Sequence, residues 1–340
     1  MTGAALDMLQ AEIAAFRTTR RLARVSEVGR GLLRITGAGG DWSMGDRAVI
    51  HTASGPIGGE IILLDAEGAA VLCDNSPDGV RLGDKVDLVG QPVLMPDISW
   101  IGRIIDPFGK PIDGRPLRKG QFAQPLRSAP PFAATRRRLG PRLETGMRAF
   151  NTLLPLVRGQ RIGLFAGSGV GKSTLMAHFA CTLQADITVI ALIGERGREL
   201  REFAEDVLGP DGMARSIIIA ATSDQSPLVR RRAAWAAMAV AEYFRDQGKN
   251  VLFLADSITR LAEAHREIAL AAGEPPSLRG YPPSTSHLIM SLAERAGPGT
   301  EGMGDITAVF SVLVAGSDMD GPVADILRGV LDGHVVLDRD

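Results

Sequence analysis

The chain has 340 residues, which is enough for two or three domains with hydrophobic cores of their own. Its formal net charge is −1, so the composition argues against a general nucleic-acid-binding surface. The two cysteines, Cys73 and Cys181, lie too far apart for a disulfide framework or a metal cluster, and no apolar run reaches the roughly 18 residues of a membrane span, so we expect a cytoplasmic protein.

The first stretch, residues 1–22, carries apolar residues at helical spacing and predicts an amphipathic helix. Leu6, Leu9, Ile13 and Phe16 form its apolar face. Such a helix either docks on a partner or a membrane surface, or packs on its own domain, and the sequence leaves both interpretations open.

Residues 23–90 consist of short β-like runs separated by turn-forming residues. Their spacing predicts a small β-barrel domain with a structural role. The expected strands cover residues 32–35, 48–51, 57–64, 69–73 and 85–89.

Residues 91–145 are rich in proline, glycine and arginine, and we interpret them as an ordered connector with a long extended segment. Strand and helix patterns then alternate through residues 146–340, which indicates an α/β domain with a mainly parallel sheet covered on both faces. The expected strands are 162–165, 187–193, 216–220, 251–255 and 306–314, and the expected helices are 172–183, 198–207, 227–247, 258–272 and 284–296.

A glycine-rich turn between the first of these strands and its helix predicts a phosphate-binding loop. Glycines allow the backbone N–H groups to turn toward a phosphate, Lys172 would contact the β- and γ-phosphates, and the Ser173 hydroxyl would bind Mg²⁺. The alternative is a structural turn between a core strand and a core helix. The expected ATP-binding set is Ala166, Gly167, Ser168, Gly169, Val170, Gly171, Lys172, Ser173 and Thr174, with the small Ala166 replacing the first glycine of the usual pattern.

Two further strand ends offer carboxylates to the same edge of the sheet. Asp256 ends an apolar strand and would hold Mg²⁺ through a water molecule, although it could instead cap the helix that follows. Glu195 and Glu199 are both candidates for the group that orients the attacking water, and spacing alone does not rank them; Arg196 could steady the phosphates from the same loop.

The segment after the third strand has two interpretations. Asp224 or Gln225 could sense the γ-phosphate, or the segment could be a capping turn in which Ser226 is the N-cap of the next helix.

Several motifs together resemble one family, the flagellum-specific ATPases of the type III protein export apparatus, which are relatives of the catalytic subunit of rotary ATP synthases. The motifs are GLFAGSGVGKST, LIGERGRELREF, ATSDQSPL, FLADSITRLAEAHREIALAAGEPP and RGYPPS. The resemblance implies an N-terminal β-barrel, a RecA-like P-loop core and a C-terminal helical domain, with ATP and Mg²⁺ as cofactors. It implies the catalytic residues Lys172, Glu195 and Arg196, favouring Glu195 over Glu199, and the metal residues Ser173 and Asp256.

The resemblance also implies homohexamers with ATP at the subunit interfaces, located in the cytoplasm at the inner face of the membrane. The expected partners are a stator-like regulatory subunit, export chaperones and their substrates, and a membrane export gate, with no nucleic acid.

Two departures from the family pattern are visible. Asn151 stands where relatives usually have aspartate, a small change that we expect to be tolerated. In the family, a strand with an arginine for the neighbouring subunit's site and a helical domain follow the core, and neither is present in this sequence, so we expect a C-terminally truncated version. An injectisome ATPase and a nucleotide-binding form with weak catalysis are the alternatives.

Overall fold

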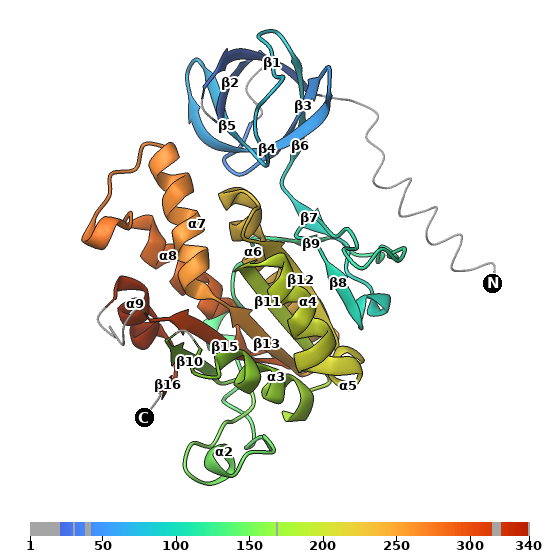
Figure 1. Ribbon diagram of the computed structural model, residues 1–340, viewed down its shortest axis with the longest axis vertical. Helices are drawn as coiled ribbons and strands as arrows, with labels where there is room; N and C mark the ends of the chain where they lie inside the picture. The colour runs from blue at the N-terminus through green and yellow to red at the C-terminus, as the bar shows by residue number, and fades with distance from the viewer. Residues whose placement is uncertain (1–20, 30, 38–41, 168, 315–320, 339–340) are drawn as a thin grey trace, which may run out of the picture.

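The computed structural model describes residues 21–29, 31–37, 42–167, 169–314 and 321–338. Figure 1 shows a barrel at one end of the molecule and a larger α/β part beneath it. The helix expected over residues 1–22 lies outside the described residues up to residue 20. Its last two residues, Arg21 and Leu22, begin a β-strand, so the expected helix is wrong there.

The barrel is closed by six antiparallel strands in the order β1-β2-β5-β4-β3-β6, and five of them are the expected ones. In β2, β3 and β6 alternate residues are buried, and the barrel encloses an apolar core that includes Leu33, Ile50 and Val71. The unexpected strand is β1, which pairs with both β2 and β6 and closes the barrel. The strands are β1 (Arg21–Val28), β2 (Leu32–Thr36), β3 (Arg47–Thr52), β4 (Gly55–Asp65), β5 (Gly68–Cys73) and β6 (Lys85–Gly90).

The α/β part contains a parallel sheet in the order β16-β10-β15-β13-β11-β12-β8. The five expected strands form its centre, and a short strand, β14 (Gly297–Pro298), pairs antiparallel with β15. The parallel strands are β8 (Arg103–Ile105), β10 (Arg161–Ala166), β11 (Ile187–Glu195), β12 (Ser216–Thr222), β13 (Val251–Asp256), β15 (Asp305–Leu313) and β16 (Gly333–Leu337).

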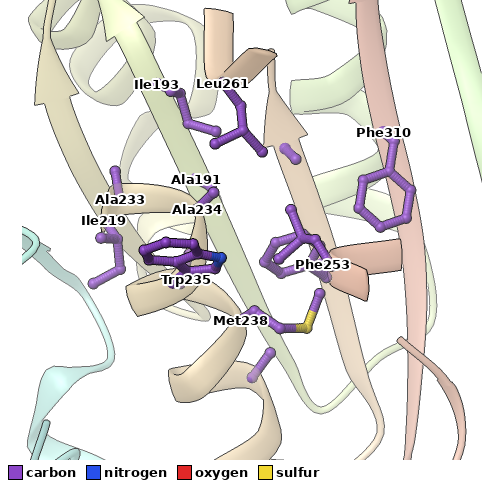
Figure 2. Close-up of a cluster of buried hydrophobic side chains, with 14 of the residues drawn as sticks. Ala191, Ile193, Ile219, Ala233, Ala234, Trp235, Met238, Phe253, Leu261 and Phe310 are labelled. Atoms are coloured by element: carbon purple, nitrogen blue, oxygen red, sulfur yellow. The ribbon is translucent and has the colours of Figure 1, made fainter. Parts of the chain in front are cut away.

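Helices cover both faces of this sheet and bury a separate apolar cluster on each (Figure 1). On one face lie α6 (Pro227–Asp246), α7 (Ile258–Ala271), α8 (Ser284–Arg295) and α9 (Pro322–Val330). On the other lie α3 (Lys172–Thr182), α4 (Gly197–Glu202), the π-helical turn η3 (Phe203–Leu208) and α5 (Gly209–Met213). Figure 2 shows the first cluster, where Trp235 and Met238 of α6 lie beside Phe253 of β13 and Phe310 of β15.

The connector region contributes more to the sheet than the sequence predicts. Its strand β8 pairs in parallel with β12 and forms one edge of the sheet. Arg103 of β8 is held by both oxygens of Asp113, at 2.6 and 2.7 Å, which fixes the loop after the strand. The other connector elements are β7 (Val93–Leu94), β9 (Gln124–Pro125) and the short helices η1 (Ile98–Trp100) and η2 (Ala133–Thr135). After the connector, the short helix α2 (Arg148–Thr152) precedes β10, and η4 (Leu278–Gly280) lies between α7 and α8.

The barrel contacts the α/β part through a buried ion pair and a small apolar cluster. Glu60 of β4 accepts hydrogen bonds from Arg127 and from Arg231 of α6. Ile62 of the barrel packs with Leu228 and Ile268 of α6 and α7. Within the described residues, none of the helices is long and apolar enough to cross a membrane.

Candidate nucleotide site

The predicted phosphate loop follows β10 at the carboxyl end of the sheet, and α3 begins directly after it (Figure 1). Gly169 and Gly171 have φ values of +74° and +92°, a region of conformational space that side chains disfavour. Gly171 is the N-cap of α3, so the free N–H groups of the first helical turn point out of this end of the sheet. This local geometry is that of an anion cradle.

Six of the nine expected loop residues line a cavity of about 820 Å³: Gly167, Gly169, Gly171, Lys172, Ser173 and Thr174. Ala166 does not line it, because it is the buried last residue of β10, where its carbonyl accepts a hydrogen bond from Val314. Val170 is not among the lining residues either, and Ser168 lies outside the described part of the chain. We call this space the nucleotide cavity.

Lys172, which lines the nucleotide cavity, forms a largely buried ion pair with Asp256. Asp256 ends β13, and Ser311 of the neighbouring strand β15 donates a hydrogen bond of 2.9 Å to the same carboxylate oxygen. The capping alternative for Asp256 is wrong, because Ser257 is the N-cap of α7 and accepts from the backbone N–H of Arg260. The Asp256 carboxylate therefore faces Lys172 and Ser311 and does not cap α7.

Glu195 ends β11 and lies on the wall of the nucleotide cavity. Its carboxyl group is largely buried, which, together with the nearby Asp256 carboxylate, raises its pKa from 4.5 to about 7, against the opposing effects of Lys172 and Arg260. The Arg260 guanidinium lies 3.5 Å from Glu195. A carboxyl group whose pKa lies near 7 can both accept and return a proton at neutral pH.

Glu199 is hydrogen-bonded to Glu195, so the two candidates that spacing could not rank form one carboxyl pair. Burial favours a higher pKa for Glu199, but the hydrogen bonds from Glu195 and from Arg196 outweigh it and lower its pKa. These opposite shifts make Glu195 the more readily protonated carboxyl of the pair and Glu199 the more readily ionised one. Arg196 lines the cavity with a mostly exposed side chain and donates to Glu199 at 2.8 Å.

Asp224 and Gln225 are not among the residues that line the nucleotide cavity. The Gln225 side chain accepts a hydrogen bond from the backbone N–H of Thr222, and Ser226 caps α6 by accepting from Val229. The geometry is that of the predicted capping turn.

Sequence reasoning missed three polar residues of the site: Thr259, Arg260 and Ser311. Thr259 and Arg260 belong to the first turn of α7. They follow Asp256 by three and four residues, and this closeness in sequence could have identified them. Ser311 has no local signal, because only the parallel register of β15 against β13 brings it to Asp256.

Among the described residues, no group of three or more His, Cys, Asp or Glu side chains is arranged to hold a metal ion. A site built from one serine hydroxyl, one carboxylate and the oxygens of a ligand does not need such a group.

Asn151 belongs to α2, and its side chain is hydrogen-bonded to Thr145 and Glu144. Its amide oxygen accepts from Thr145, at 2.7 Å from the hydroxyl, and its amide N–H₂ donates to Glu144. An aspartate at this position could accept from Thr145 but could not donate to Glu144, so the asparagine suits the acidic neighbour of this chain.

Comparison with known proteins agrees with this geometry. Residues 146–340 match the nucleotide-binding domain of the ATP synthase alpha/beta family. The flagellum-specific ATP synthase of Agrobacterium fabrum is 45% identical over 316 residues, which cover 93% of this chain and 67% of that protein. The type 3 secretion system ATPase of Xanthomonas euvesicatoria is 41% identical over 335 residues, covering 98% of this chain and 75% of that protein.

A solved structure has the same fold. The assembled ATPase EscN from the type III secretion system of enteropathogenic E. coli is 36% identical, with a TM-score of 0.84 over 93% of this chain and 76% of that one. The β-barrel followed by a RecA-like parallel sheet is thus the fold that the sequence predicted. Sequence, fold and phosphate loop agree, and the chain belongs to the ATP synthase alpha/beta family.

Proposed function

We propose that the chain binds ATP with Mg²⁺ in the nucleotide cavity and hydrolyses it. One observation carries the proposal: three separate elements, α3, β11 and β13, bring Lys172, Ser173, Glu195 and Asp256 to the same end of one parallel sheet. The cavity of about 820 Å³ falls within the range of roughly 300–1,000 Å³ that is usual for small-molecule and cofactor sites.

The residues present fit a magnesium ion. Asp256 is nearly fully buried, and the Lys172 ammonium group balances its charge, so the position already accommodates a cation. Ser173 and Asp256 together line a small pocket of about 190 Å³ that adjoins the nucleotide cavity and would supply hard oxygen ligands. Bound there, Mg²⁺ would neutralise charge on the phosphate oxygens.

The chain's own residues have distinct proposed roles in hydrolysis. The loop glycines and the N-terminus of α3 bind phosphate through N–H groups, and Lys172 adds a charge-assisted hydrogen bond. Glu195 orients the attacking water and accepts its proton, a role that suits a carboxyl group with a pKa of about 7. Arg196 and Arg260, one on each side of this carboxyl pair, are placed to offset negative charge as it develops.

We propose that hydrolysis drives flagellar type III protein export, because the relatives from Agrobacterium, Bacillus and Salmonella are named flagellum-specific ATP synthases. Export through an injectisome is the alternative, supported by the Xanthomonas relative and by EscN. We also propose that the chain forms a homohexamer and binds a stator-like or central-stalk partner, as EscN does in its complex with EscO. Export chaperones as further partners, and a peripheral location at the inner face of the cytoplasmic membrane, belong to the same proposal. The division into residues 1–22, 23–90, 91–145 and 146–340 is also part of this proposal.

The test is Mg²⁺-dependent ATP hydrolysis by the purified chain, measured at several protein concentrations together with its mass in solution. Lys172→Ala should abolish nucleotide binding, and Glu195→Gln should keep binding but lose at least 100-fold in turnover. Glu205→Gln, at an exposed position on η3 that pairs only with Arg201 among the described residues, is the matched control and should behave as the unmodified chain.

Two results would decide against parts of the proposal. ATP binding without turnover above the uncatalysed rate would support the non-hydrolysing alternative, and a specific activity that does not rise with concentration would argue against hexamer-dependent catalysis. If Lys172→Ala binds and hydrolyses ATP normally, the site assignment is wrong. The export components that copurify with the chain would separate flagellar from injectisome function.

A further inference from the structure

A second cavity, of about 350 Å³, lies where α6, α7 and α8 meet the segment after β9, and it shares no lining residue with the nucleotide cavity. We call it the arginine cavity. Its described lining contains no aspartate or glutamate. The polar and aromatic residues used in the argument are Arg127, Arg231, Arg295, Trp235, His287 and Ser291.

Two of the arginines share one carboxylate. Arg127 and Arg231 both donate to the same Glu60 oxygen, at 2.8 and 2.9 Å. Both guanidinium groups also lie over the Trp235 ring, 4.2 and 4.8 Å from its centre. Burial lowers the pKa of Arg231 to about 10, so it stays protonated at neutral pH. Two positive charges against one negative charge leave an excess at the cavity wall.

Two further carboxylates lie close to the cavity. Arg295 is neutralised by two hydrogen bonds to Glu242, at 2.9 and 2.6 Å. Glu274 is not a lining residue, but its carboxylate accepts hydrogen bonds from the backbone N–H and the hydroxyl of Ser284, which does line the cavity.

The neighbouring His265 is affected by the positive field of these arginines. Burial and then Arg231 lower its pKa to about 4, and Arg127 acts in the same direction, while Glu274 opposes them. His265 is therefore neutral at pH 7, and its Nε2 lies 2.8 Å from the Ser284 hydroxyl.

We propose that the arginine cavity binds a small phosphate-bearing anion. Arg127 retains its Nε and Nη1 donors, which donate to none of the described residues, and its side chain is 43% exposed. A guanidinium fork matches phosphate geometry, and His287 and Ser291 add polar groups on the α8 side. The anion would accept hydrogen bonds from these Arg127 donors, and the volume suits a group the size of phosphate or a compact phosphate ester.

The experiment uses inorganic phosphate as the probe and isothermal titration calorimetry as the measurement. Because the phosphate loop also attracts phosphate, the full-length chain carries Lys172→Ala in every arm. Ser291→Asp places a negative charge at the cavity wall, and Ser286→Asp places one on the same helix away from the lining. We expect Ser291→Asp and Arg127→Gln to weaken phosphate binding at least tenfold and Ser286→Asp to leave it unchanged.

A second arm with ADP identifies the source of the phosphate group. ADP binding that is lost on Ser291→Asp would assign the cavity to a nucleotide phosphate, whereas binding of inorganic phosphate alone would assign it to free phosphate. The absence of binding for both probes, or equal binding to the Ser291→Asp and Ser286→Asp variants, would overturn the proposal. Thermal unfolding of each variant shows whether it is folded, and Arg127→Gln tests the site again if Ser291→Asp is not. Because the cavity is separate from the phosphate loop, this result does not depend on ATP turnover.

Discussion

Removing the charge of Glu195 should stabilise the chain at alkaline pH. In the folded chain the Glu195 carboxyl has a pKa of about 7, whereas the ordinary glutamate value of 4.5 applies in the unfolded chain. Between these two values the folded chain binds more protons than the unfolded chain, so the free energy of unfolding falls as pH rises. The stabilising contribution of the protonated form is complete below pH 4.5 and lost once pH passes about 7.

The size of the effect follows from the same two values. A difference of about 2.5 pH units between them corresponds to about 3 kcal/mol at 1.36 kcal/mol per unit. The lowered pKa of Glu199 acts in the opposite direction and reduces this value. We therefore expect Glu195→Gln to raise the free energy of unfolding by about 1–3 kcal/mol above pH 8. A glutamine also keeps the hydrogen bond to Glu199, because its amide group is a donor.

The assay is thermal unfolding of nucleotide-free protein at pH 5 and pH 8.5, for the unmodified chain and for Glu195→Gln. We expect the variant to unfold roughly 2–6 °C higher at pH 8.5 and at nearly the same temperature at pH 5. Glu199→Gln is the control: it removes a carboxylate that Arg196 stabilises, and it should not raise the unfolding temperature at pH 8.5. An unfolding temperature for Glu195→Gln that is equal or lower at pH 8.5 would refute the reasoning.

Three further predictions concern buried polar groups. Ser311→Ala removes a buried hydrogen bond to Asp256 and should lower the free energy of unfolding by about 1–2 kcal/mol in urea titrations; a neutral effect would mean that Asp256 does not need this donor. Glu60→Gln leaves the buried Arg231 without its carboxylate and should destabilise the chain by about 3 kcal/mol, with earlier proteolysis between the barrel and the α/β part; unchanged protease resistance would contradict this. His265 has a pKa of about 4 in the folded chain and 6.5 in the unfolded chain, so acidification from pH 6.5 to 4 protonates the unfolded chain first and lowers the free energy of unfolding. His265→Gln should reduce this loss, and an unchanged pH profile of the unfolding temperature would contradict the prediction.

The fold was predictable wherever one strand or helix carries its own pattern. The five central strands and the helices α3, α6, α7 and α8 begin within one residue of their expected positions, because apolar periodicity and caps such as Ser226 are local signals. The missed strands are short or lie at edges. β8 has three residues, and β16 pairs only with β10, so neither has a long apolar run. β1 begins inside the helix expected over residues 1–22, and its remaining residues, 23–28, were not among the expected strands.

The candidate site, too, was predictable only where its residues are contiguous in sequence. The phosphate loop is contiguous in sequence, so its glycines and Lys172 could be recognised from spacing. The partners of the two carboxylates could not, because Ser311 reaches Asp256 and Arg260 reaches Glu195 only through the packing of separate elements. The pairing of Glu195 with Glu199 also depends on the helical turn after β11, which places both side chains on one wall.

The ion pair between Lys172 and Asp256 bears on how a nucleotide enters this site. Lys172 is the group proposed to bind phosphate, and Asp256 is the group proposed to bind the metal, yet the two side chains neutralise each other in a largely buried ion pair. If Lys172 turned to a phosphate alone, Asp256 would keep only the Ser311 hydrogen bond and remain a buried charge without a cation. A ligand that brings a phosphate for Lys172 and a cation for Asp256 at the same time leaves no charge unpaired. The pairing of Lys172 with Asp256 therefore favours the metal–nucleotide complex over either component alone.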